Sequence, residues 1–157
     1  SLKSFSWMAL LFQKTISNYR WNQKSYQSMA DKIVLADTSI LIDYFRKTDK
    51  QNSVLIHLFD QGYDFTISAI SYYEIYSGTS TNQLPFWKNL LQKTKVLALD
   101  EVVAQAAVNI NKELKKKRKQ IEMADLFNAS TAVANKLPFA TLNKKYFDRV
   151  DTFLIIE

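Results

Sequence analysis

The sequence predicts an α/β fold in which a five-stranded parallel sheet is flanked by helices on both faces. Apolar runs of about four residues alternate with longer segments whose apolar residues recur at helical spacing, a pattern typical of a parallel sheet covered by helices. Of the 157 residues 47% are apolar, and only two are Gly and two Pro. The chain can therefore bury a core and form one globular domain.

The five predicted strands are short, and the first is a continuous apolar run, which indicates that both of its faces are buried. The first, residues 33–36, ends directly at Asp37. The others are residues 64–67, 96–99, 139–142 and 153–156.

The predicted helices fill the intervals between these strands. Asp37, Thr38 and Ser39 offer N-cap chemistry to the first helix, which continues through Phe45. Asp100 is placed to cap a long helix over residues 101–118. The remaining helices are predicted over residues 51–61, from Ser71 to a stop at Gly78, over 83–93 and over 123–136.

Four polar residues are predicted to meet at one edge of this sheet. Asp37 follows the first strand, and Glu74 lies on the helix after the second. Asp125 lies in the first turn of the helix that leads to the fourth strand, and Asn143 follows that strand. Ligands of such sheets bind beyond the carboxyl ends of the strands, so we expect a functional site there.

Each of the four residues also has a purely structural explanation. Asp37 is placed to cap its helix, and Ser71 with Glu74 matches the capping-box pattern S-x-x-E. Asp125 would complement a helix dipole, and Asn143 would be an ordinary turn residue. The functional interpretation depends on whether the four side chains converge.

Converging carboxylates would require a cation. Two carboxylates about 5 Å apart repel by roughly 3 kcal/mol at an effective dielectric constant near 20. Mg²⁺ or Mn²⁺ prefers such oxygen ligands and activates a bound water for hydrolysis. The chain has no Cys, which excludes a thiolate zinc site, and its single histidine, His57, excludes a nuclease built on two histidines.

The polar residues lie in segments that resemble the motifs of PIN domains of the VapC toxin type. Residues 37–43 and 70–78 resemble the first two motifs, and residues 123–132 resemble the third. Thr141-Leu142-Asn143 with Phe147 resembles the fourth. The resemblance covers residues 31–157 with the motifs in the family's order.

This resemblance implies a PIN-like, Rossmann-like sheet and a metal-dependent endoribonuclease that cleaves RNA, with a structured RNA such as tRNA as its target. It also implies a toxin that forms a homodimer and is neutralised by a cognate VapB-like antitoxin. Asp37, Glu74 and Asp125 correspond to the metal-binding catalytic acids. Asn143 stands at a catalytic position where many members have Asp, which leaves the number of metal ions and the strength of the activity open.

Other side chains near these motifs have less specific roles. We expect Ser39 and Thr141 to form hydrogen bonds with the acids. Asp43 is predicted to be structural or on the surface, and Asn128 either lines the pocket or lies on the helix surface. Tyr72 and Tyr73 either stack on RNA bases or pack in the core, with core packing expected for at least one.

Basic residues cluster at the end of the long helix. This cluster either is a solvated helix end that complements the helix dipole or binds RNA phosphates beside the active site. Its members are Lys115, Lys116, Lys117, Arg118 and Lys119. The net charge of +6 is less informative, because residues 1–28 contain four basic residues and no acidic one.

The sequence divides into residues 1–28, an N-terminal amphipathic extension, and residues 29–157, the PIN-like domain. The extension is an upstream-translated or engineered segment, a helix packed on the domain, or a targeting or membrane-surface segment. Its apolar run is too short for stable membrane insertion, and we expect the protein in the cytoplasm. The alternative functions are a non-toxin PIN nuclease that processes RNA or cuts DNA and a degenerate PIN domain that binds RNA or protein without cleavage.

Overall fold

The computed structural model describes residues 32–150 and 155–156 and contains the predicted parallel sheet. All strand pairs are parallel, and the order in the sheet is β3-β2-β1-β4-β5. The strands are β1 (Lys32–Ala36), β2 (Tyr63–Ser68), β3 (Val96–Leu97), β4 (Phe139–Ala140) and β5 (Ile155–Ile156). The predicted fold class is therefore confirmed.

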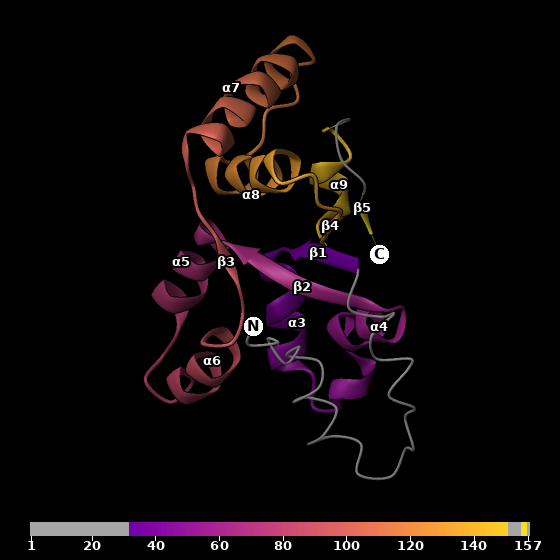
Figure 1. Cartoon of the computed structure of the whole chain (residues 1–157), viewed down its shortest axis with the longest axis vertical. Helices are drawn as coiled ribbons and strands as arrows, with labels where there is room; N and C mark the ends of the chain where they lie inside the picture. The colour runs from indigo at the N-terminus through magenta and orange to yellow at the C-terminus, as the bar shows by residue number, and fades with distance from the viewer. Residues whose placement is uncertain (1–31, 151–154, 157) are drawn as a thin grey trace, which may run out of the picture.

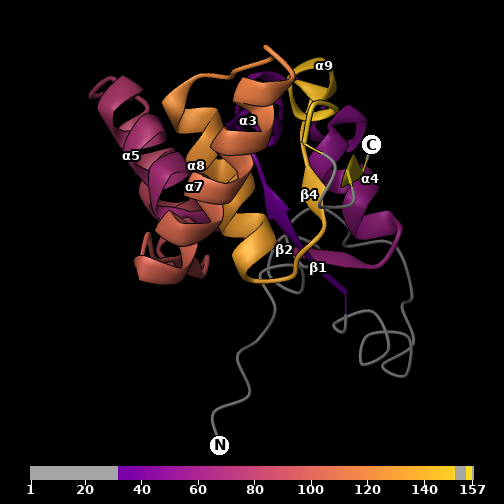
Figure 2. The same cartoon turned by 90° about the horizontal axis from the view of Figure 1, so that it is seen from above.

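Helices cover both faces of the sheet (Figures 1 and 2). The crossover from β1 to β2 carries α3 and α4 on one side, and the crossover from β3 to β4 carries α7 and α8 on the other. The helices are α3 (Thr38–Arg46), the 3₁₀ helix η1 (Lys50–Asn52), α4 (Val54–Asp60), α5 (Ala69–Gly78), α6 (Leu84–Leu91), α7 (Glu101–Lys116), α8 (Met123–Ala134) and α9 (Lys144–Phe147). None of the helices in the described ranges is both long and apolar enough to cross a bilayer.

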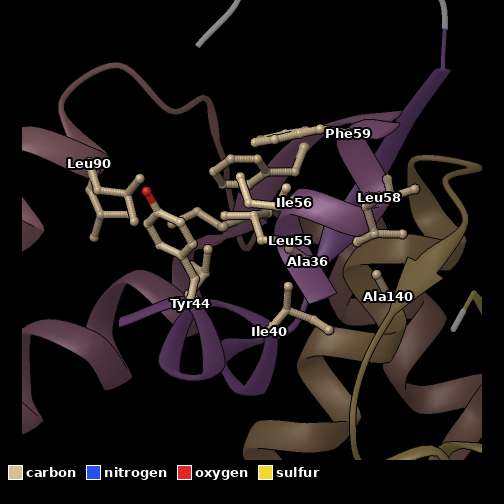
Figure 3. Packing of buried hydrophobic residues seen from close by; sticks show 14 of the residues in the cluster. Ala36, Ile40, Tyr44, Leu55, Ile56, Leu58, Phe59, Leu90 and Ala140 are labelled. Atoms are coloured by element: carbon tan, nitrogen blue, oxygen red, sulfur yellow. The ribbon is translucent and has the colours of Figure 1, made fainter. Parts of the chain in front are cut away.

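Strand β1 is the centre of the fold because its side chains enter a separate core on each face. Val34 and Ala36 pack into the larger cluster, together with buried residues of α3, α4 and α6. Figure 3 shows this cluster, in which Tyr44, Leu55 and Phe59 are among the packed side chains. On the opposite face Leu35 packs with residues of α8, β4 and α9: Ala129, Ala132, Phe139 and Phe147. Burial on both faces explains why the strand is a continuous apolar run.

Several predicted boundaries were wrong. The helix expected over residues 51–61 is divided at Ser53, whose hydroxyl accepts from the Ile56 N–H and caps α4. The third and fourth strands each have only two residues, and α5 begins at Ala69 rather than at Ser71. The short helix α9 was not predicted. The helix expected within residues 1–28 and residues 153–154 of the fifth strand lie outside the described residues.

Candidate active site

The candidate site lies at the switch point of strand order, between the carboxyl ends of β1 and β4. The chain proceeds from β1 outward to β2 and β3, and then returns to place β4 on the other side of β1. Asp37 follows β1 and Thr141 follows β4, and the Asp37 N–H donates to the Ala140 carbonyl at 2.8 Å. This is the position at which open α/β sheets bind their ligands.

Asp37 is buried, with 3% of its surface exposed, and its carboxylate faces the site. Its side chain makes no capping hydrogen bond to α3, so the explanation of Asp37 as a simple helix cap is wrong. Oδ2 instead accepts from the hydroxyls of Ser39 and Thr141, each at 2.8 Å. Hydrogen bonds from Ser39 and Thr141 to one of the acids were expected from the sequence.

Glu74 projects toward Asp37 from the middle of α5. The N-cap of α5 is Ser68, whose hydroxyl accepts from the Ser71 N–H at 2.9 Å, so the capping box expected between Ser71 and Glu74 is absent. Glu74 Oε1 accepts from the Thr38 hydroxyl at 2.9 Å. The first residue of α3 thus fixes one of the acids.

Asn128 joins the two acids. It lies on α8 with only 1% of its surface exposed, and its Nδ2 lies 3.5 Å from Asp37 Oδ1 and 3.4 Å from Glu74 Oε1. Its Oδ1 accepts from the hydroxyls of Ser68 and Ser71. Carboxylates accept hydrogen bonds and do not donate them, so the amide nitrogen must face the acids and the oxygen the serines.

Asp125 shares the electrostatic environment of this pair. It lies in the first turn of α8, and burial raises the pKa of its carboxyl, with further increases from the negative charges of Asp37, Glu74 and Glu122. Its side chain makes no hydrogen bond with any described residue. Within the described ranges, no three carboxylate or imidazole side chains are already gathered closely enough to hold a metal ion. Asp125 is therefore near the other two acids without completing a ready ligand set.

Asn143 contributes to the site through its backbone. Its N–H donates to Thr141 Oγ1 at 2.9 Å, and Thr141 in turn donates to Asp37. The side chain of Asn143 is exposed, and in the described part of the chain no hydrogen bond joins it to an acid. The structure thus places Asn143 at the rim, one step removed from the carboxylates.

Asp43 and the tyrosines beside Glu74 lie outside the carboxylate cluster. Asp43 accepts from the Val54 N–H at 3.0 Å and pairs with Lys47 at 3.8 Å, so its role is structural. Tyr72 and Tyr73 are 43% and 68% exposed. The expectation that at least one of them packs in the core was wrong.

The basic cluster predicted as an RNA-binding surface lies at the exposed end of α7. Lys115 and Lys116 are in the last turn, and Lys117 is the C-cap. Arg118 has a left-handed backbone (φ 53°), and Lys119 follows it. Binding of RNA by this cluster stays a prediction.

Most of the polar network that supports the acids was not predicted from the sequence. Thr38 and Ser71 were considered only for helix capping, Ser68 was not considered, and Asn128 was left between a pocket and a surface position. Asn128 lies three residues after Asp125, which places both on one helix face, and this spacing was the one available signal.

We expect Asp125→Asn to raise the melting temperature of the metal-free protein at neutral pH. Because its pKa in the fold is raised above 3.8, the Asp125 carboxyl contributes most to stability below that pH, and the contribution is lost as the pH rises through the raised pKa. Asparagine carries no charge at any pH, so the variant does not lose this stability as the pH rises. Thermal unfolding in EDTA at several pH values measures the effect, and the advantage of the variant should shrink toward pH 3.8. A variant less stable than the parent at neutral pH would contradict the charge argument.

Comparison with known proteins gives a consistent result. The PIN domain family model matches residues 34–152. Ribonuclease VapC1 of Methanocaldococcus jannaschii is 33% identical over 121 residues, which cover 76% of this chain and 82% of that protein. The DNA-bound VapBC of Salmonella typhimurium has a chain with a TM-score of 0.70 at 22% identity, covering 80% of this chain and 96% of that one. A toxin-antitoxin complex from Klebsiella pneumoniae has a chain with a TM-score of 0.62 at 21% identity, covering 79% and 96%.

Proposed function

The chain belongs to the PIN domain family, and from that premise we propose that it is a divalent-metal-dependent endoribonuclease. The observation that carries the proposal is the placement of Asp37, Glu74 and Asp125 at the switch point of the sheet, close enough that two of the acids raise the pKa of the third. The similarity to Ribonuclease VapC1 supports RNA as the substrate.

The donor set fits a hard divalent cation. Carboxylate oxygens are the ligands that Mg²⁺ and Mn²⁺ prefer. Burial and then the negative charges of Asp37, Glu74 and Glu122 raise the pKa of Asp125, and a cation would offset these charges. Asp37, Glu74 and Asp125 are the residues that would hold it, after a local adjustment of the Asp125 side chain. When bound, the cation supplies an activated water and stabilises the charge that develops on the phosphate oxygens.

The protein's own contribution is to orient these acids. Ser39 and Thr141 both donate to Oδ2 of Asp37, which leaves Oδ1 directed toward the site. Thr38 holds Oε1 of Glu74, and among the described residues none donates to Oε2. Asn143, at the exposed rim, is placed to orient water or substrate with its amide.

We also propose that the protein acts as a toxin in the cytoplasm, as a homodimer neutralised by a VapB-like antitoxin, with a structured RNA such as tRNA as its target. The support is the fold shared with chains of VapBC and toxin-antitoxin complexes. A small antitoxin gene immediately upstream, whose product co-purifies with this chain and suppresses its cleavage of RNA, is the expected finding.

The ribonuclease proposal is tested by titrating Mn²⁺ into the purified full-length chain with a mixed RNA substrate. We expect cleavage to rise with Mn²⁺ and to stop when EDTA is added. An Asp37→Asn variant purified in parallel controls for contaminating ribonuclease, and single-stranded DNA tests the choice of substrate. Cleavage that EDTA does not affect would reject the mechanism. Metal binding without cleavage would favour a PIN domain that binds RNA without cutting it.

A further inference from the structure

A buried amide bridges two acids that come from different parts of the chain. We propose that Asn128 is a positioning residue that holds Asp37 and Glu74 in register around a single divalent cation. The inference rests on the metal-dependent function proposed above and adds to it a residue and a metal stoichiometry.

The geometry suits an amide and no other neutral side chain of its size. One Nδ2 group carries two hydrogens, and it lies at nearly equal distances from Asp37 Oδ1, at 3.5 Å, and Glu74 Oε1, at 3.4 Å. The two carboxylates repel each other, and a shared donor offsets part of that repulsion without adding a charge. A side chain without donors at this position would remove the hydrogen bonds that link the two acids to one group.

Two serine hydroxyls hold the amide of Asn128 on the side that faces away from the acids. The hydroxyls of Ser68 and Ser71 donate to Oδ1 of Asn128, so a flipped amide would lose both bonds and turn its oxygen toward the carboxylates. Ser68 is also the N-cap of α5, the helix that carries Glu74. Asn128 therefore ties the start of α5 to α8 and sets the position of Glu74 relative to Asp37.

The arrangement at Asp37 favours a single ion. Two-metal sites hold their ions about 3.5–4 Å apart, so that both ions need ligands from the same few acids. Oδ2 of Asp37 already accepts from Ser39 and Thr141, so Oδ1 alone is available as a ligand. Asp37 would therefore hold a cation through Oδ1 alone, and this arrangement favours one bound ion over a pair held on the two oxygens of Asp37.

The test is a titration of the full-length chain with Mn²⁺, followed by electron paramagnetic resonance, which gives the number of bound ions and their dissociation constant. We expect one ion per wild-type chain. For Asn128→Ala we expect the affinity to fall by about 10- to 100-fold, the usual effect of losing a residue that orients metal ligands. Ser130→Ala is the matched control, because Ser130 is also buried on α8 but donates only to the Leu126 carbonyl of its own helix. Its Mn²⁺ affinity should equal that of the wild type.

The outcomes separate the inference from the function on which it rests. An unchanged Mn²⁺ affinity in folded Asn128→Ala would overturn the positioning role while leaving the ribonuclease proposal intact, and two ions per wild-type chain would overturn the single-ion arrangement. Wild-type protein that binds no Mn²⁺ would overturn both proposals. If circular dichroism shows Asn128→Ala to be unfolded, Ser71→Ala takes its place, since it keeps the amide but removes one of its two anchors. Its affinity should fall several-fold, and an unchanged value would again reject the role of Asn128.

Discussion

Replacing Asp37 with Asn is expected to reduce Mn²⁺-dependent RNA cleavage by at least about 100-fold, the lower bound for removing a group that stabilises developing charge. The substitution changes one oxygen to nitrogen and removes a negative charge at the point where the proposed cation would be held. The fold should persist, because the buried residue keeps its shape and the hydroxyls of Ser39 and Thr141 can reorient toward an amide.

The experiment compares initial rates of cleavage of a labelled RNA by the parent and the variant at saturating Mn²⁺, with melting temperatures measured alongside. Asp43→Asn is the matched control, because Asp43 binds the Val54 N–H and Lys47 away from the carboxylate cluster. It should lose about 1 kcal/mol of stability and little activity. A folded Asp37→Asn variant that cleaves RNA at the parental rate would remove Asp37 from the mechanism.

Phe139→Ala is expected to lower the free energy of unfolding by about 3–5 kcal/mol, a large part of the stability of a domain of this size. Phe139 is fully buried in β4, and its ring packs edge-to-face on Phe147 with the centroids 4.7 Å apart. The cavity would open beneath Leu35 on the face of the sheet that α8 covers. Two residues further on, Thr141 would lose its fixed position against Asp37.

Urea denaturation followed by circular dichroism measures this effect. Phe139→Leu keeps most of the volume and should cost less than the alanine variant. Leu142→Ala, at a side chain that is 50% exposed in the same segment, should change stability by no more than about 0.5 kcal/mol. Equal losses of unfolding free energy for Phe139→Ala and Leu142→Ala would show that the cluster around Leu35 does not depend on Phe139.

The architecture could be predicted from the sequence because short strand-like segments, most of them apolar, alternate with longer segments whose apolar residues recur at helical spacing. Strand ends were harder to predict, since they depend on where a neighbouring strand stops offering hydrogen bonds. Leu99 illustrates this limit: it continues the apolar run of β3 but is 42% exposed and lies outside the strand. The start of α5 was misplaced because both Ser68 and Ser71 are good caps, and the choice falls to Ser68, which also bonds to Asn128 on another helix.

The site was predictable only as far as topology determines it. Placing Asp37, Glu74 and Asp125 at one sheet edge requires only the order of strands and helices. The bridge through Asn128 depends on rotamers and on helix packing, which residue spacing does not encode. The direction in which the basic cluster at 115–119 points was likewise undetermined, since a run of lysines specifies charge but not which neighbouring surface receives it.

The central position of β1 also bears on the order in which the molecule assembles. Its partner on one side, β2, arrives soon after it along the chain, but the contact between Thr141 and Asp37 joins residues 104 positions apart. Closing so long a loop costs chain entropy that only the later contacts repay, and folding is slow where such pairings dominate. During synthesis on a ribosome, Asp37 therefore gains its hydrogen bond from Thr141 only after β4 has emerged and docked. Shorter nascent chains lack the assembled carboxylate site.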